Sequence, residues 1–138
     1  ASTTLLLKGS RMPFAPAILE EYQTEYFKWD KPVPYMTEVH AIRREKQKII
    51  SAVTHVDGTG RLQTVMKRTN RVFWDLINEF RIITGIPVVL NTSFNIKGEP
   101  IVDSPSDAIN TFLNSGIDDL FLQNYWVSKK ILNNKYAG

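Results

Sequence analysis

Four small polar side chains follow directly on an apolar strand pattern, and their types suit ligand binding. Asn91, Thr92, Ser93 and Asn95 come after the apolar stretch Val88–Leu90. Their hydroxyl and amide groups can contact phosphate oxygens or a metal-bound water, and small molecules bind in open α/β sheets just outside the carboxyl ends of strands. The same residues would also form an ordinary Asx or serine turn that leaves the core. The pattern therefore predicts either a ligand site or such a turn.

A turn with two glycines precedes an arginine near the middle of the chain. The segment Asp57–Gly60 is a turn of the Asp-Gly type, and Arg61 follows it. A turn tightened by glycines brings backbone amides together, where they can receive an anion, and Arg61 could hold a phosphate through two donors. A plain hairpin with a surface arginine fits equally well. His55, just before the turn, could act as a base or orient a phosphate, or it could make only local hydrogen bonds.

Three further charged residues are weaker candidates. Lys8 and Arg11 lie in a glycine-serine segment and could clamp a phosphate, although two exposed cations are the more ordinary interpretation. Glu99 could hold a magnesium-bound water, but a salt bridge to a neighbouring lysine is favoured. The chain has no phosphate-binding P-loop, no Rossmann glycine fingerprint and no G-x-S-x-G nucleophile elbow. We therefore expect neither a covalent nucleophile nor a metal site within this chain.

Composition places the chain among ordinary globular proteins. Its 138 residues, 43% hydrophobic and 22% charged, suit one domain over residues 1–138 with a sizeable core. No apolar run approaches the roughly 20 residues that cross a bilayer and no secretory leader opens the chain, so we expect a cytoplasmic protein with no membrane partner. The absence of cysteine excludes disulfides and thiolate zinc sites, and the two histidines disfavour a polyhistidine metal centre.

The charge balance argues against nucleic acid as a partner. The 17 basic and 14 acidic residues give a net charge of +3, an excess too small to imply nucleic acid when no single face is visibly basic. The basic clusters Arg43–Lys48 and Lys67–Arg71 are expected to be solvated loops. The first residue is Ala1 rather than methionine, so we expect a piece of a longer polypeptide.

Hydrophobic periodicity favours an α/β (α+β) fold, a mixed sheet with helices packed on it. A helix from Arg71 should bury its apolar stripe and end at Gly85, with Trp74 and Arg81 off the stripe. A second helix should begin at a Ser104 cap. The residues expected to be buried on the two helices are Val72, Phe73, Leu76, Ile77, Phe80, Ile83, Ala108, Ile109, Phe112 and Leu113. The other expected elements are an edge strand or irregular extended chain within Met12–Leu19, a helix at Glu20–Phe27, strands at Tyr35–Ile42 and Leu120–Val127, a buried strand in the sheet interior at Val88–Leu90, and a hairpin of Ile49–Val56 with Arg61–Val65.

Four separate motifs occur in one order along the chain. They are Met12–Pro16 (MPFAP), Ala52–Val65 (AVTHVDGTGRLQTV), Thr84–Asn95 (TGIPVVLNTSFN) and Lys97–Val102 (KGEPIV). Together they resemble the carboxyl-terminal domain of O-carbamoyltransferases of the nodulation-protein-U and cephamycin/tobramycin type. The resemblance covers the chain from about Met12 to Val127.

The resemblance implies both a fold and an activity. It implies a YrdC-like domain, a mixed twisted sheet with helices packed on it, which joins carbamoyl phosphate and ATP in the presence of Mg²⁺ to form carbamoyl-adenylate. In such enzymes a larger Kae1-like amino-terminal domain of the same polypeptide, which carries an iron site, moves the carbamoyl group to a hydroxyl acceptor. Iron is therefore expected only in that domain, which lies outside this chain. The chain itself would be the activating half of a two-site enzyme.

The resemblance also assigns residues, position by position. It implies binding of nucleotide and carbamoyl phosphate by His55, Arg61, Asn91, Thr92, Ser93 and Asn95. It implies catalysis through charge neutralisation and positioning by Arg61, Ser93, Lys8 and Arg11. The family's Lys-x-Arg before the Pro-Phe-Ala-Pro motif is here Lys8-Gly9-Ser10-Arg11, with Met12 directly following. Full substrate affinity is therefore expected to depend on how this altered segment is placed.

Two alternative interpretations stay open. The altered lysine-arginine segment would suit a non-catalytic docking or regulatory module for the amino-terminal domain, and such a module would bind neither ATP nor carbamoyl phosphate. The related YrdC fold also serves tRNA threonylcarbamoylation. That activity would need a strongly basic concave face, which the modest charge excess does not favour.

Overall fold

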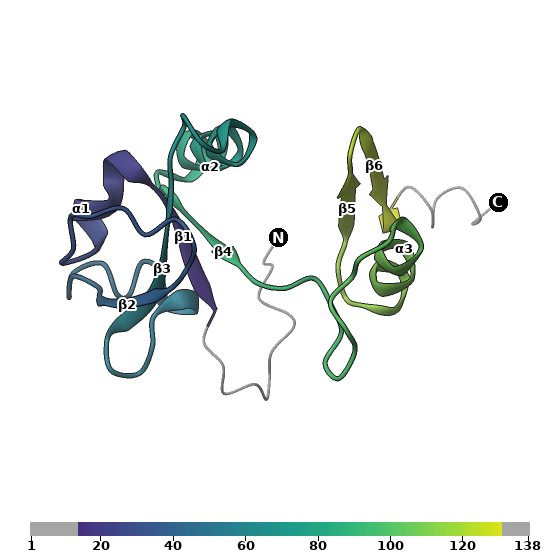
Figure 1. The fold of residues 1–138 in the computed structure, drawn as a ribbon, viewed down its shortest axis with the longest axis horizontal. Coiled ribbons are helices and arrows are strands. Elements are labelled where there is room, and N and C mark those ends of the chain that lie inside the picture. Colours follow the sequence, from purple (N-terminus) through teal and green to yellow (C-terminus); the bar gives the residue numbers. More distant parts are fainter. Residues whose placement is uncertain (1–13, 131–138) are drawn as a thin grey trace. The chain divides into compact units, whose positions relative to one another are not determined.

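The computed structural model describes residues 14–130, which form two compact units. Within the described range the first unit covers residues 14–92 and the second covers residues 93–130 (Figure 1). Among the helices of residues 14–130, none is long and apolar enough to cross a membrane. Lys8 and Arg11, two of the predicted catalytic residues, lie outside the described residues.

A four-stranded mixed sheet forms the frame of the first unit. Its strands are β1 (Ala15–Leu19), β2 (Glu38–Ala41), β3 (Thr59–Val65) and β4 (Val88–Asn91), and they lie in the order β2-β3-β1-β4. β1 and β3 run parallel, whereas β2 and β4 are antiparallel to their neighbours (Figure 1). Together with the helices, this mixture of strand directions confirms the predicted α/β (α+β) class.

Two apolar clusters fill the two faces of this sheet, because side chains alternate between the faces along each strand. The helix α2 (Arg71–Thr84) covers one face and contributes Ile77, which is fully buried. The other face packs against the segments around Phe27 and Ile42. The buried members are Ala17, Leu19, Val65 and Ile77 on the α2 side, and Ile18, Tyr26, Phe27, Val33, Ile42, Ile50, Val53, Leu62 and Val88 on the other.

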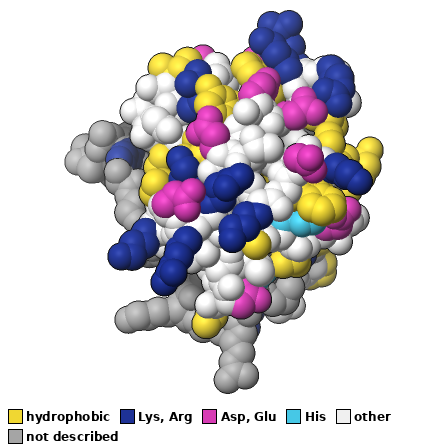
Figure 2. All heavy atoms as spheres, turned by 90° about the vertical axis from the view of Figure 1, so that its left-hand side faces the viewer, with side chains coloured by type: hydrophobic (Ala, Val, Ile, Leu, Met, Phe, Trp, Pro, Cys, Tyr) yellow, Lys and Arg dark blue, Asp and Glu magenta, His cyan; other side chains and the backbone are white. Residues whose placement is uncertain are grey.

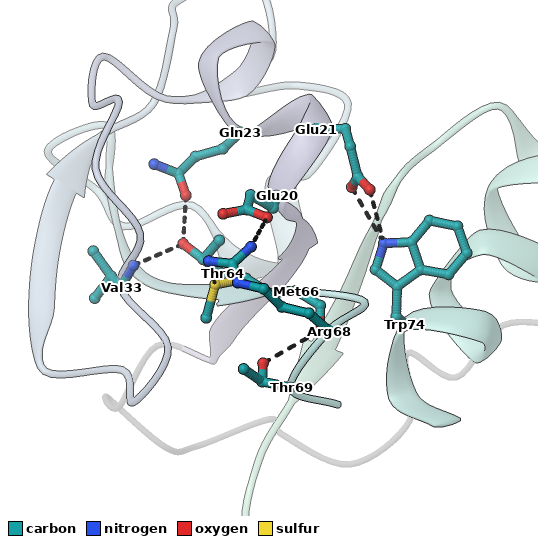
Figure 3. Close-up of polar contacts among 9 residues, drawn as sticks. All are labelled: Glu20, Glu21, Gln23, Val33, Thr64, Met66, Arg68, Thr69 and Trp74. Carbon is teal, nitrogen blue, oxygen red and sulfur yellow. Dashed lines mark hydrogen bonds and ion pairs between the residues drawn. The ribbon is translucent and has the colours of Figure 1, made fainter. Parts of the chain in front are cut away.

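A short helical segment after β1 is tied to the sheet by buried polar contacts (Figure 3). It consists of the 3-10 helix η1 (Glu20–Tyr22) and the helix α1 (Gln23–Tyr26), which confirms the predicted helix in this region. The buried Thr64 hydroxyl donates to the side-chain oxygen of Gln23 and accepts from the Val33 amide at 2.9 Å. Because each buried polar atom has a partner, the network holds this segment against β3 without leaving an unpaired group.

The inward face of α2 differs from the predicted stripe. The helix ends at Gly85, with φ of 76°, as predicted. Of the six apolar residues predicted to be buried, only Ile77 is buried, and Phe73 is half-buried. The other four, which we call the outward stripe, are exposed: Val72, Leu76, Phe80 and Ile83. The prediction of the buried face was therefore largely wrong.

Two side chains predicted to lie off the stripe make the inward contacts instead. Trp74 packs partly into the cluster of the α2 face and donates from Nε1 to the Glu21 carboxylate at 3.2 Å (Figure 3). The Arg81 guanidinium lies 5.3 Å from the centre of the Tyr22 ring. Tryptophan and arginine carry large apolar surface along with their polar ends. They can therefore replace aliphatic residues against the core, which simple apolar counting does not foresee.

Three strand predictions were wrong in position or pairing. β1 lies in the interior of the sheet rather than at its edge, although Pro16 lacks an amide hydrogen. Residues 49–56 form turns and the 3-10 helix η2 (Ser51–Val53) instead of a strand, so β3 pairs with β2 and β1 and not with the predicted hairpin partner. β4 is an edge strand, and Leu90 is 42% exposed. Local patterns do not say which strands pair, because pairing is set by long-range packing.

The second unit consists of a helix and a hairpin. The helix α3 (Pro105–Asn114) is capped by Ser104, whose hydroxyl accepts from the Asp107 amide at 3.1 Å, as the predicted cap requires. The strands β5 (Asp119–Leu122) and β6 (Tyr125–Ser128) form an antiparallel pair. Ala108 and Phe112 are buried as predicted, whereas Ile109 and Leu113 are exposed.

The hairpin replaces the single strand predicted at Leu120–Val127. The chain reverses at Gln123, which has φ of 53°, and Asn124 follows it. Glycine and asparagine are the usual residues at positive φ in tight turns, and glutamine is not. The turn was therefore hidden within a run of apolar and aromatic residues.

Basic side chains on the face drawn in Figure 2 are mixed with acidic and apolar ones. Two basic side chains of the described residues make contacts within the chain: the Lys46 ammonium lies 4.5 Å from the centre of the Tyr26 ring, and Arg68 pairs with Glu20 at 2.8 Å. The two predicted basic clusters lie largely in turns, as expected. On this face the cations do not gather into a continuous patch of one sign.

Candidate functional site

The predicted polar residues begin with Asn91, the last residue of β4, at the end of the sheet where the chain enters β1 and β3. β4 is antiparallel to β1, so Asn91 at its carboxyl end pairs with Ala15 at the amino end of β1. Arg61 is near the amino end of β3, which runs parallel to β1. This end of the sheet therefore carries the amino ends of the two parallel strands. Ligands of open α/β sheets usually bind at the opposite end, outside the carboxyl ends of parallel strands, so that rule does not apply to this site.

Arg61 and Asn91 project from one face of the sheet, on either side of β1. Residues paired across neighbouring strands point to the same face. The parallel pairing of β1 and β3 joins Ala17 to Gln63, and Arg61, two residues before Gln63, points to the same face. On the other side of β1, Ala15 pairs with Asn91, so Asn91 shares that face. At a strand spacing of about 4.8 Å, the backbones of Arg61 and Asn91 stand roughly 10 Å apart. A guanidinium and a carboxamide that flank a small residue in this way can contact one phosphate group from two sides.

The charged end of Arg61 is not neutralised by the described part of the chain. Arg61 is exposed, and the ion pairs found among residues 14–130 join other side chains. Thr92, directly after Asn91, is also exposed. An exposed guanidinium without a described carboxylate partner suits the binding of a polyanion.

Gln63 links the two outer strands of this arrangement, and the sequence-based prediction missed it. The Asn91 side chain donates from Nδ2 to Gln63 Oε1 at 2.8 Å, over the small residues of β1. Gln63 Nε2 donates in turn to the carbonyl of Pro34 at 3.2 Å. Gln63 therefore fixes the orientation of the Asn91 carboxamide. A signal existed, because Gln63 follows Arg61 by two residues in a strand and must share its face.

The turn before β3 is closed by its own hydrogen bonds. The His55 amide donates to the Thr59 carbonyl at 2.8 Å, and the Gly58 amide donates to the His55 carbonyl at 2.9 Å. The Thr59 amide donates to Asp57 Oδ1 at 3.0 Å. Gly58 has φ of 79°, which glycine adopts without strain. These three amides are therefore occupied within the turn, which favours the plain hairpin over an anion site at these amides.

The side chains of the same turn form a second set of hydrogen bonds. His55 Nδ1 lies 3.0 Å from Thr59 Oγ1, which lies 2.6 Å from Asp57 Oδ1. The side-chain and backbone hydrogen bonds from Thr59 lower the pKa of Asp57 below its ordinary value of 3.8. His55 Nε2 is buried and has no hydrogen-bond partner among the described residues. The predicted site residue His55 is therefore held by one ring nitrogen and unpaired at the other.

Ser93 and Asn95 belong to the second unit. Ser93 is exposed, and Asn95 Nδ2 donates to the carbonyls of Ile96 and Glu99 at 3.2 Å each. Asn95 therefore closes the polar loop, while its side-chain oxygen remains an acceptor. The convergence of Ser93 and Asn95 with Arg61 stays a prediction.

A cavity of about 530 Å³ lies in the second unit between the loop after Asn95 and α3. Glu99, Asp107 and Asn110 are among the residues that line it. No ion pair among the described residues involves Glu99, so the predicted salt bridge to a lysine is not found there. Within residues 14–130, no group of three or more histidine or acidic side chains is placed to hold a metal ion.

The chain matches one protein family and several nodulation proteins over most of its length. The family described as carbamoyltransferase C-terminus matches residues 6–129. The chain is 47% identical over 121 residues to nodulation protein NolNO of Sinorhizobium fredii, a match that covers 86% of this chain and 18% of that protein. It is 47% identical over 126 residues to nodulation protein NolO of Bradyrhizobium diazoefficiens, covering 89% and 23%.

A third relative carries the same family relationship at lower coverage. Nodulation protein U of Rhizobium tropici is 40% identical over 86 residues, which cover 62% of this chain and 15% of that protein. The chain thus spans about a fifth of the length of the curated relatives it matches. Since the family match covers nearly the whole sequence, the chain belongs to the carbamoyltransferase C-terminus family, the carboxyl-terminal region of a family of enzymes.

Proposed function

We propose that this chain is the carbamoyl-activating half of an O-carbamoyltransferase. It joins carbamoyl phosphate and ATP to form carbamoyl-adenylate, and a Kae1-like amino-terminal domain of the same polypeptide transfers the carbamoyl group to a hydroxyl acceptor. Membership of the family supports carbamoyl transfer in general. The observation that carries the finer proposal is that Arg61 and Asn91 lie on one face of the sheet, in the two strands on either side of β1.

The proposed reaction has two steps. Water first cleaves carbamoyl phosphate to carbamate and inorganic phosphate. A carbamate oxygen then attacks the α-phosphorus of ATP, the bond from that phosphorus to the bridging oxygen breaks, and pyrophosphate leaves. Negative charge collects on phosphoryl oxygens in the second step, so catalysis depends on positioning and on cationic neutralisation.

The residues of the chain divide this work by their chemistry. Arg61 supplies a fixed positive charge with paired donors. One N–H of the Asn91 carboxamide is engaged by Gln63, which leaves its second N–H and its oxygen for the ligand. Mg²⁺ carried by the nucleotide phosphates adds further charge neutralisation when it is bound. The remaining proposed contacts come from His55, Thr92, Ser93, Asn95, Lys8 and Arg11.

Replacement of Arg61 tests this proposal in the full-length enzyme. Arg61→Ala should slow carbamoyl-phosphate-dependent ATP–pyrophosphate exchange by on the order of 10²-fold or more, because a charge-stabilising donor is lost. Arg61→Lys should recover only part of the rate, since an ammonium group lacks the paired donors. Arg71→Ala removes an equally charged, exposed side chain from α2 and should leave the rate unchanged. Undiminished exchange in Arg61→Ala would refute the proposed role.

A second candidate function is a non-catalytic docking or regulatory module for the rest of the same polypeptide. The outward stripe of α2 favours it, because exposed apolar faces often contact another domain, and the relatives are several times longer than this chain. Calorimetry of the full-length protein with ATP and with carbamoyl phosphate separates the two functions. A purely docking chain predicts that Arg61→Ala leaves both affinities unchanged, whereas the activating role predicts that at least one of them falls.

A further inference from the structure

Three side chains in the turn before β3 form a chain of hydrogen bonds that ends on a histidine. Asp57 Oδ1 lies 2.6 Å from Thr59 Oγ1 and 3.0 Å from the Thr59 amide nitrogen. Thr59 Oγ1 lies 3.0 Å from His55 Nδ1. His55 Nε2, at the far side of the ring, is buried and has no hydrogen-bond partner among residues 14–130. The arrangement orients one ring nitrogen and leaves the other unpaired.

The direction of these hydrogen bonds follows from the number of protons. The Asp57 carboxylate can only accept, because hydrogen bonds from Thr59 lower its pKa and keep it ionised at neutral pH. The Thr59 hydroxyl has one proton, and the 2.6 Å contact commits that proton to Asp57. The Thr59 oxygen must then accept from His55, so Nδ1 carries the ring proton. In the neutral ring Nε2 is therefore a lone-pair acceptor.

A buried acceptor without a partner destabilises a folded protein, and native structures keep few such atoms. Here Thr59 and Asp57 orient the ring that carries it, so Nε2 is held in place as an acceptor. The substrates of the proposed reaction offer two N–H groups of this kind. One is the amide of carbamoyl phosphate, and the other is the exocyclic amine of adenine.

We propose that Asp57 and Thr59 are positioning residues that hold His55 with its proton on Nδ1, so that His55 Nε2 accepts a hydrogen bond from an N–H group of a substrate. The inference rests on the proposed function, because the adenylate-forming reaction is what brings the carbamoyl amide and the adenine amine to this chain. An acceptor at Nε2 discriminates against acetyl phosphate or against inosine triphosphate, each of which lacks one of these N–H groups.

Long-range ¹⁵N–¹H NMR of the imidazole nitrogens in the full-length protein tests the proton position, with His55→Gln to assign the signal. His55 should show the Nδ1–H form, which free histidine disfavours, and the Nε2 signal should move when the substrate with the N–H group is added. Thr59→Val should abolish the preference for Nδ1–H, and Thr59→Ser should restore it. Asp57→Ala alters an exposed side chain and should act like Thr59→Val, so it provides the same test if Thr59→Val fails to fold.

Exchange kinetics identify the donor. Thr59→Val should raise the KM of one substrate about 10-fold, the effect of one neutral hydrogen bond, while kcat changes little. If the adenine amine is the donor, wild type and Thr59→Val should have equal KM values once inosine triphosphate replaces ATP. If the carbamoyl amide is the donor, the 10-fold difference should appear in the KM for carbamoyl phosphate and persist with inosine triphosphate.

Two results would overturn the inference. One is a His55 ring that keeps its proton on Nδ1 in both Thr59→Val and Asp57→Ala. The other is an Nε2 signal that neither substrate moves, together with KM values that Thr59→Val leaves unchanged. Failure of the proposed function would be recognised by a different result, namely full ATP–pyrophosphate exchange in Arg61→Ala. The position of the ring proton of His55 is measured in the ligand-free protein and does not depend on that result.

Discussion

At the scale of single residues, one hydrogen bond fixes the orientation of the Asn91 carboxamide. Its Nδ2 donates to Gln63 Oε1 at 2.8 Å, and Gln63 is itself held by the Pro34 carbonyl. A carboxamide fixed in this way loses little side-chain freedom when a ligand arrives, and lost freedom is one of the main costs of binding. The Asn91 side of the candidate site is therefore preorganised before any substrate is present.

Acid should weaken the contribution of Asp57 to stability. The hydrogen bonds from Thr59 lower the pKa of Asp57 in the folded chain below the ordinary 3.8. A carboxyl group with a lowered folded pKa stabilises the fold above its unfolded pKa and loses that effect as the pH falls through the folded value. The difference in unfolding free energy between wild type and Asp57→Ala should thus be constant above about pH 5 and shrink below about pH 4.

Denaturant titrations at a series of pH values measure this difference. The same comparison in a Thr59→Val background is the control, because Asp57 then lacks the side-chain hydrogen bond that lowers its pKa most. In the Thr59→Val background, the effect of Asp57→Ala on the free energy of unfolding should vary less with pH. A difference between wild type and Asp57→Ala that does not vary with pH would contradict the assignment.

The residues of the site differ in how far the sequence could predict them. His55, Asp57 and Thr59 lie within one turn, so their contacts are local and a turn motif predicts them. Gln63 and Asn91 are separated by 28 positions and meet only because β1 lies between their strands. Sequence periodicity gives the face on which each side chain lies, but not which strand lies beside it.

At the scale of elements, α2 shows why an apolar stripe is an incomplete guide to burial. The position of the helix follows from local signals, with a capping Asn70 at one end and Gly85 at the other. The rotation of the helix about its own axis depends on which side chains of the sheet and of the neighbouring segments it contacts. Trp74 and Arg81 contact the segment after β1, which turns the outward stripe away from the described core.

Two alanine substitutions on α2 measure this rotation. Ile77 is fully buried, so Ile77→Ala should lower the free energy of unfolding by about 2–4 kcal/mol through lost burial and the cavity left behind. Val72 is 83% exposed, so Val72→Ala should change it by no more than about 0.5 kcal/mol. Urea denaturation of the two variants gives both values. Equal costs would mean that the outward stripe is buried in the protein as it exists.

At the scale of the whole molecule, the charge distribution sets what kind of partner can bind. The net charge is only +3, and on the face in Figure 2 cations alternate with acidic and apolar side chains. Tight binding of RNA depends on several cations acting together on the phosphate backbone. The face drawn in Figure 2 therefore lacks the continuous basic surface that a long polyanion needs.

We therefore expect no appreciable binding of tRNA, even at about 50 mM salt where such contacts are strongest. Fluorescence anisotropy of labelled tRNA with the full-length protein measures this, and a basic tRNA-binding protein serves as the positive control. Tight binding that falls steeply as salt is raised would instead favour an activity on tRNA.

The fold class could be predicted from the sequence, whereas the strand order could not. The helices at residues 71–84 and 105–114 follow from caps and periodicity. The order β2-β3-β1-β4 places segments side by side that are far apart in the chain. It depends on which apolar faces pack together, and no local window contains that information.

Pro16 has a consequence for how this sheet assembles. It occupies an interior strand opposite Leu90. In the same register the Leu19 amide donates to the Pro87 carbonyl, so by the alternation of an antiparallel pair Pro16 needs no amide hydrogen toward β4. If β1 slid by one residue, the imide nitrogen would arrive where a neighbouring carbonyl lacks its donor, and every side chain of the strand would change faces. A misaligned intermediate thus loses a backbone hydrogen bond and also exposes its apolar side chains. A single proline therefore disfavours incorrect alignment of the strands during folding.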